Sequence, residues 1–197
     1  MRLNATEASA NHSVFQGKKK IVRTVLAAIV LLSAVFYGLH ASRTYAKSPT
    51  IMEFSTMAGV PRPYTGAANA IRGINGGGLP WVISSAEGEL KQSGELELTV
   101  TGLVIDPNDP AAIAAGRAGI NPIASFKAIV SCLSKDANGA ANVVNVSTDP
   151  FPATTGPASA GGGNASVEAQ VSLPTPCIAP IIFVTSPTGA WFAATGR

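Results

Sequence analysis

The feature that most constrains the fold is a strict alternation of apolar and polar residues in several short segments. In residues 95–101 the side chains of Leu96, Leu98 and Val100 alternate with glutamate and threonine. Because successive side chains of a β-strand point to opposite faces of the sheet, this period of two predicts a strand with one buried and one solvated face. Residues 81–90 precede it across a Gln-Ser-Gly segment, and a glycine-containing turn between two such segments predicts a hairpin.

The same alternation recurs further along the chain. Residues 122–134 have one apolar set of alternate side chains, the better candidate for a core face, formed by Phe126, Ala128, Val130 and Cys132. Shorter strands separated by proline and glycine turns are predicted over 142–147, 165–173, 179–185 and 190–195. About seven short strands at such intervals predict an all-β fold, an antiparallel, immunoglobulin-like β-sandwich of about 120 residues.

The composition separates a sandwich domain from the segment before it. Hydrophobic residues make up 46% of the 197 residues and charged residues 13%, which excludes a chain disordered by composition. Residues 47–79 are rich in proline and glycine and lack periodicity, so we expect an entry segment of low order ahead of a sandwich over 80–197. Its glycine-rich stretch, 75–80, lacks the Lys-Ser/Thr of a phosphate-binding loop and is interpreted as a loop that packs over the sheet.

The N-terminal part has the layout of an export signal. Four basic residues between positions 18 and 23 precede an apolar run over 24–39, which at 1.5 Å per residue is about 24 Å long and too short for the hydrocarbon core of a membrane. This arrangement predicts a signal peptide over 1–46, cleaved after Ala46 or alternatively after Ala41. The other interpretation is an uncleaved signal anchor. Residues 1–17 are long for a basic region and are interpreted as a non-native extension from an early start codon.

The net charge of the part that follows the predicted signal differs in sign from that of the whole chain. The formal net charge is +3, yet residues 47–197 hold eight basic and ten acidic residues, a net charge of about −2. Their basic residues are scattered, whereas nucleic-acid binding needs clustered ones, so no nucleic-acid partner is predicted. Membrane contact is predicted only through an uncleaved N-terminal segment.

Histidine chemistry is excluded from the exported part. Both histidines, His12 and His40, precede residue 47. Residues 47–197 therefore lack the groups needed for Ser-His-Asp or Cys-His catalysis and for histidine-containing zinc sites. No catalytic residue, cofactor or metal site is predicted.

Two cysteines, Cys132 and Cys177, follow the predicted export signal. In an oxidising compartment such a pair predicts one structural disulfide. The closed loop of about 46 residues would contribute roughly 4 kcal/mol of stability on the chain-entropy model. Two cysteines without histidine do not complete a zinc site, and there is no Cys-x-x-Cys redox pair. Secretion or a cell-surface location follows from the signal and the cysteines together.

Four acidic residues are the candidates for an enzymatic function. Glu87, Glu89, Glu95 and Glu97 gather near one predicted hairpin, and paired carboxylates are what glycoside hydrolysis requires. Glu95 and Glu97 also alternate with core residues, as expected for a solvated strand face. A carboxylate-dependent secreted hydrolase is therefore the alternative hypothesis.

Two further features have a functional and a structural interpretation. Asp106 and Asp109 have oxygens that suit Ca²⁺, but the flanking prolines favour a plain Asx turn. Trp191 and Phe192 are adjacent on a predicted strand and face opposite sides of it. We therefore predict that this pair forms a patch that contacts a partner.

Several stretches resemble a family of exported bacterial domains whose function is uncharacterised. They are AIRGINGGGLPW (70–81), GELELTVTGLVI (94–105), SFKAIVSC (125–132) and VSLPTPCIAPIIFV (171–184). The resemblance covers about 66–196, includes both cysteines and implies a secreted domain with a Cys–Cys bridge and no catalytic residues to transfer. The preferred function is a non-enzymatic structural or interaction module, whose partner is a cell-envelope polymer or another surface protein. The sequence does not indicate an oligomeric state.

Overall fold

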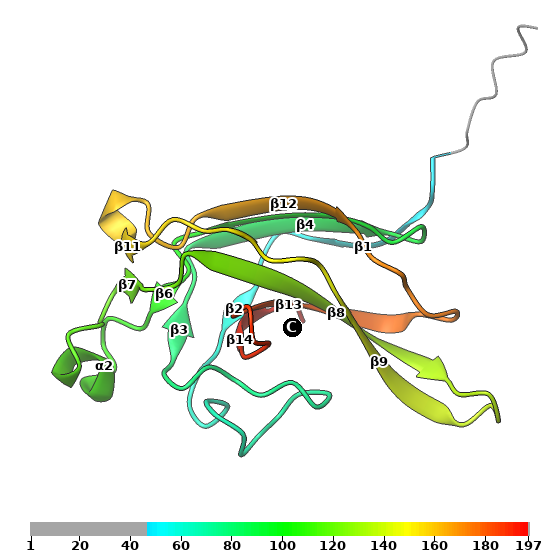
Figure 1. Cartoon of the computed structure of the whole chain (residues 1–197), viewed down its shortest axis with the longest axis horizontal. Helices are drawn as coiled ribbons and strands as arrows, with labels where there is room; N and C mark the ends of the chain where they lie inside the picture. Colours follow the sequence, from blue (N-terminus) through cyan, green and yellow to red (C-terminus); the bar gives the residue numbers. More distant parts are fainter. Residues whose placement is uncertain (1–46, 197) are drawn as a thin grey trace, which may run out of the picture. The chain divides into compact units, whose positions relative to one another are not determined.

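The computed structural model describes residues 47–196, and the predicted signal segment over 1–46 lies outside them. Residues from Ser48 onward form one structural unit. Its regular structure is almost entirely antiparallel β-strand, arranged as two main sheets, so the predicted all-β, sandwich-like fold is confirmed (Figure 1). No helix between residues 47 and 196 reaches the length and hydrophobicity that a membrane span requires.

The first sheet has four strands in the order β1-β4-β5-β12. They span Thr50–Phe54 (β1), Ser85–Lys91 (β4), Glu95–Thr101 (β5) and Ala165–Gln170 (β12). The predicted hairpin is present as β4 and β5, and the Gly94 N–H donates to the Lys91 carbonyl at 2.9 Å to close its turn. Gly94 has a φ of +91°, which glycine adopts without steric cost.

The second sheet has six strands, with the path β10-β8-β13-β14-β2 and β9 paired to β8. The strands span Ala58–Gly59 (β2), Ser125–Lys135 (β8), Ala141–Ser147 (β9), Phe151–Pro152 (β10), Ile178–Thr185 (β13) and Trp191–Ala194 (β14). Two short strand pairs lie outside the main sheets: β3 (Trp81–Val82) with β6 (Val104–Ile105), and β7 (Ile120–Asn121) with β11 (Gly156–Pro157). Within residues 47–196 the helical elements are α2 (Pro110–Ala114) and the 3₁₀ turn η1 (Ala158–Ala160).

The hydrophobic core lies between the inner faces of the two sheets. Leu96, Leu98 and Val100 of β5 are buried, as their alternation predicts. From the other sheet, Phe126 and Val130 of β8 are fully buried in the same cluster. Each such side chain contributes about 1.5–3 kcal/mol when it is removed from water, so the period-two segments account for the main hydrophobic contacts between the layers.

The predicted boundary at residue 80 is wrong, because the sandwich begins earlier. Thr50–Phe54 forms β1 at the edge of the first sheet, and Ala58–Gly59 pairs with β14. The glycine-rich stretch is a loop, as interpreted, and it pairs with the backbone of β14: the Gly77 N–H donates to the Trp191 carbonyl at 2.8 Å, and the Trp191 N–H donates to the Asn75 carbonyl at 2.9 Å. A Cβ atom on Gly76 would lie 2.0 Å from the Tyr64 carbonyl oxygen, so only glycine fits there.

The predicted partner-contacting patch of Trp191 and Phe192 is also wrong for the described chain. Their exposed fractions are 3% and 4%. The ring of Phe192 stacks on Trp81 with 4.0 Å between centroids. Trp191 packs edge-on against Phe183, and its backbone forms a parallel bridge with Gly76 of the glycine-rich stretch. The pair therefore presents no exposed aromatic surface on either side of the strand.

Candidate functional site

The most distinctive polar surface is a row of glutamates across the first sheet. All six glutamates between residues 47 and 196 lie in its strands. Strand register places Glu53 opposite Glu89, Glu89 opposite Glu97, and Glu97 opposite Glu168. Residues directly opposite share a face of the sheet, with Cβ atoms about 4.5–5.5 Å apart. We call these four residues the glutamate row.

The glutamate row lies on the outer face of the sheet because its neighbours along each strand point inward. Leu90 of β4 and both Leu96 and Leu98 of β5 are buried in the core. The sequence therefore predicts the solvated face of β4 and β5 correctly. It does not predict that Glu53 and Glu168 join this face, because their positions depend on pairing with strands distant in the sequence.

An open groove of about 550 Å³ lies against this row. Its lining residues are Glu53, Phe54, Ser55, Glu87, Gly88, Glu89, Glu97, Leu98 and Thr99. Of the candidate glutamates, Glu87, Glu89 and Glu97 thus contribute to one surface, whereas Glu95 pairs with a lysine beside it. The predicted gathering of carboxylates is confirmed.

Lys91 is the only basic residue in the strands of this sheet. Its side chain is only 5% exposed, bonds to the Glu95 carboxylate and has its Nζ atom 3.9 Å from Glu97 Oε1. The hydrogen bond to Glu95 raises the pKa of Lys91, with attraction from neighbouring glutamates adding to the shift and burial opposing it. Lys91 therefore remains charged and offsets part of the repulsion among the carboxylates.

We expect a Lys91→Met substitution to destabilise the protein mainly at low ionic strength. The substitution leaves the facing glutamates without their cation, and like charges on adjacent strands repel. Raising the salt concentration from about 0.01 M to about 1 M shortens the Debye length from about 30 Å to about 3 Å. Thermal unfolding should show a deficit that narrows with salt, whereas Lys135→Met, at the exposed end of β8, should show little change. A deficit that is independent of salt would contradict this electrostatic account.

The two aspartates considered for Ca²⁺ serve the local backbone instead. Asp106 Oδ1 accepts a hydrogen bond from the Asn108 N–H at 2.8 Å, which confirms the predicted Asx turn. Asp109 caps helix α2 by accepting from the Ala111 and Ala112 N–H groups. Within residues 47–196, no group of three or more histidine, cysteine, aspartate or glutamate side chains is placed to hold a metal ion.

Asp109 also gives a pH dependence of known sign. Its hydrogen bond from Arg62, 2.9 Å long, lowers the pKa of this carboxyl from its ordinary value of 3.8, assisted by the helix N–H groups and opposed by burial. A lowered pKa stabilises the fold above the ordinary value, and that contribution is lost as the pH falls through the folded-state pKa. We expect Asp109→Ala to be less stable than wild type near neutral pH and the gap to close below about pH 4. The prediction is checked by thermal unfolding of wild type and Asp109→Ala at neutral pH and below about pH 4, with Asp149→Ala as the control. A stability difference between wild type and Asp109→Ala that persists in acid would contradict it.

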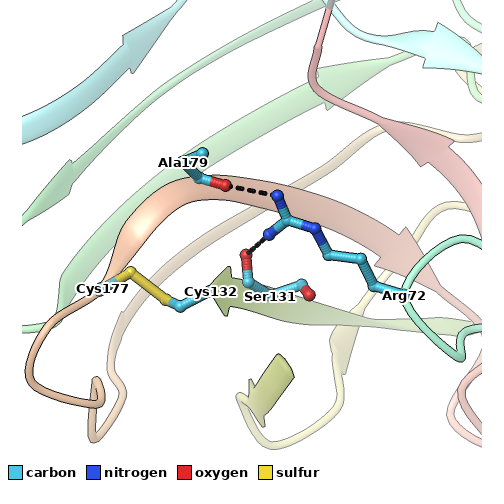
Figure 2. Close-up of a disulfide and its surroundings, with 5 residues drawn as sticks. All are labelled: Arg72, Ser131, Cys132, Cys177 and Ala179. Atoms are coloured by element: carbon cyan, nitrogen blue, oxygen red, sulfur yellow. Dashed lines mark hydrogen bonds between the residues drawn. A yellow bond between two sulfur atoms is a disulfide. The ribbon is translucent and has the colours of Figure 1, made fainter. Parts of the chain in front are cut away.

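The predicted disulfide between Cys132 and Cys177 is present and ties β8 to the chain just before β13. Figure 2 shows Arg72 reaching to the same place from the loop ahead of β3. The Arg72 Nη1 atom donates to the Ser131 carbonyl at 2.7 Å, and Nη2 donates to the Ala179 carbonyl at 2.8 Å. The covalent bond and the guanidinium together fasten the loop, β8 and β13. Such a bond is consistent with an oxidising compartment.

Comparison with known proteins adds no family to these observations. No family model, no curated protein and no solved structure matches the chain. The glutamate row and its groove are therefore the evidence on which a function is proposed.

Proposed function

We propose that this chain is an exported, non-enzymatic interaction module that binds a basic segment of another surface protein along its glutamate row. The observation that carries the proposal is the register of Glu53, Glu89, Glu97 and Glu168 across four strands. Facing like charges cost stability in a sheet. A cationic partner lying along the row would relieve that repulsion.

The dimensions of the row favour an extended partner. Neighbouring strands are about 4.8 Å apart, so four strands place the outer carboxylates about 14 Å from one another. Lysine or arginine side chains spaced along an extended peptide match charges distributed in this way. A single small cation would contact only part of the row.

Export is supported by two features. The leader has the layout of a signal peptide, and the Cys132–Cys177 bond is consistent with the oxidising conditions outside the cytoplasm. The partner is accordingly sought among proteins of the cell surface.

The alternative is a carboxylate-dependent glycosidase, which the facing carboxylates of the row favour. Glycosidases use two carboxyl groups that flank the scissile bond, and Glu89 and Glu97 lie opposite each other on adjacent strands, with their side chains on one face of the sheet. However, a general acid needs an environment that keeps its carboxyl protonated near neutral pH. The side chain of Glu97 is 50% exposed beside an open groove, which favours a solvated binding carboxylate.

The proposal is tested by the binding of a fluorescent decalysine to the purified chain. We expect the double substitution Glu53→Gln/Glu97→Gln to weaken binding roughly two- to thirtyfold, given about 0.2–1 kcal/mol for each of two exposed ion pairs. The matched control, Asp136→Asn/Asp149→Asn, removes the same charge elsewhere and should bind like wild type. Equal losses in both variants would show only a general charge effect and would overturn the proposal.

A glycan panel distinguishes the alternative function. Hydrolysis of a glycoside that is abolished in both Glu89→Gln and Glu97→Gln would establish the glycosidase and displace the binding role. The absence of turnover, together with selective loss of decalysine binding in the row variant, is the result we expect.

A further inference from the structure

The outer edge of β9 is open in the second sheet. β9 pairs with β8 through seven residue pairs, from Ala141 opposite Lys135 to Ser147 opposite Ile129, without a register shift. Within residues 47–196, no strand pairs with its other edge. In Figure 1 the hairpin of β8 and β9 projects from the body of the sandwich.

Two hydrogen bonds fix which backbone groups face this edge. The Asp136 N–H donates to the Ala140 carbonyl at 2.9 Å, and the Thr148 N–H donates to the Ala128 carbonyl at 3.0 Å. In an antiparallel ladder, residues that exchange hydrogen bonds with the partner strand alternate with residues that do not. The even-numbered residues of β9 therefore bond to β8. The N–H and carbonyl groups directed at the open edge are those of Ala141, Val143, Asn145 and Ser147.

An exposed apolar row leads to the same edge. Val143 lies opposite Leu133, and Leu133 lies opposite Ile178, so the three side chains share one face of the sheet. Their exposed fractions are 40%, 40% and 53%. These are three of the six large hydrophobic residues that are exposed in the described part of the chain. The row ends at Val143 with nothing beyond it in residues 47–196.

The other sheet edges carry the features that prevent strand addition. β1 contains Glu53 and a register shift, and β12 contains Glu168. β2 and β10 have two residues each, and β10 includes a proline. β9 has the sequence Ala-Asn-Val-Val-Asn-Val-Ser, with no charge, proline or glycine. Proteins commonly protect edge strands with those devices, so the unprotected β9 stands apart.

We propose that β9 pairs antiparallel with β9 of a second copy of this chain, around a twofold axis at Val143. In this register Val143 faces its symmetry mate and Ala141 faces Asn145, and each facing pair exchanges two hydrogen bonds through the outward groups. The apolar rows of the two copies join into one across the axis. A neutral strand with an apolar centre is what this edge fits, and β9 itself is such a strand. Self-pairing also gives a closed, symmetric interface.

A register centred on Asn145 fits less well. It would place Val143 opposite Ser147 and interrupt the apolar row. In addition, the Asn145 side-chain amide donates to the Arg72 carbonyl at 3.1 Å, so the loop already occupies the outer face there. The inference is independent of the proposed function, because the glutamate row belongs to the other sheet.

Sedimentation equilibrium of the purified chain tests the dimer. We expect a concentration-dependent species of twice the 20.0 kDa chain mass, and only the monomer for Val143→Lys, which places two ammonium groups at the axis. The matched control, Ile113→Lys, changes an exposed apolar residue on α2 and should still dimerise. A wild-type monomer at all concentrations, or a dimer that survives Val143→Lys, overturns the inference.

A second variant decides the register and protects against a folding defect in the first. Facing Cα atoms of a hydrogen-bonded pair are about 5.5 Å apart, within the range that a disulfide spans. Val143→Cys should therefore form a covalent dimer on mild oxidation, whereas Ser147→Cys, away from the axis, should not. Failure of Val143→Cys to cross-link, or equal cross-linking of both variants, contradicts the proposed pairing and leaves the edge to another segment or protein.

Discussion

Replacing both Cys132 and Cys177 with alanine is expected to lower the free energy of unfolding by about 4 kcal/mol on the chain-entropy model. The bond closes a loop with a sequence separation of 45 residues, and its removal frees the unfolded chain to sample many more conformations. A loss of this size is a large share of the roughly 5–15 kcal/mol by which domains are stable. Alanine is preferred to serine because Cys132 is fully buried and a hydroxyl there would be buried with it.

Urea unfolding with and without a reductant provides the control for this prediction. Reduction should destabilise the wild-type chain by most of the same amount and should leave the double-alanine variant unchanged. A deficit below about 1 kcal/mol would mean that the unfolded chain gains little freedom from losing the crosslink.

The second large effect is expected from Phe192→Ala, at about 3–5 kcal/mol of lost stability. Phe192 stacks on Trp81 and meets Phe126 edge-on at 6.0 Å, so truncation opens a cavity inside an aromatic cluster. Tyr64→Ala is the matched control, because Tyr64 is an exposed aromatic residue and its loss should change stability by no more than about 0.5 kcal/mol. Chemical denaturation measures both. If Phe192→Ala were as stable as wild type, the side chain of Phe192 would not be packed in the core, and this prediction would be wrong.

The sequence allowed the strands with strong alternation to be predicted, because that pattern is local. In β5 the apolar residues Leu96, Leu98 and Val100 alternate with polar ones, and this spacing alone predicts which side chains are buried. The alternate residues from Phe126 to Cys132 in β8 are predicted in the same way. β1 was not predicted as part of the sandwich. Its partner β4 lies more than 30 residues away, and five residues at a sheet edge carry too little alternation to reveal the pairing.

The candidate site could be predicted in part, because some of its residues are close in the sequence and others are brought together only by the fold. The glutamates of one hairpin could be grouped from sequence, since a turn brings β4 and β5 together. Glu53 and Glu168 join them only through the order of the strands, which no local pattern specifies. Likewise, the disulfide could be predicted because the chain has only two cysteines. The contacts of Arg72 could not be predicted, because its partners are backbone carbonyls, which every residue has.

The glutamate row and the open edge of β9 belong to different sheets, and this separation affects the avidity of binding. The glutamate row occupies the first sheet, and the open edge at β9 belongs to the second. Pairing through β9 would leave the glutamate row of each copy exposed, so the dimer would carry two identical binding sites. Once the first site has engaged a repetitive basic surface, the second binds at the high effective concentration set by their fixed spacing. Weak individual contacts of exposed charges would then add up to durable attachment.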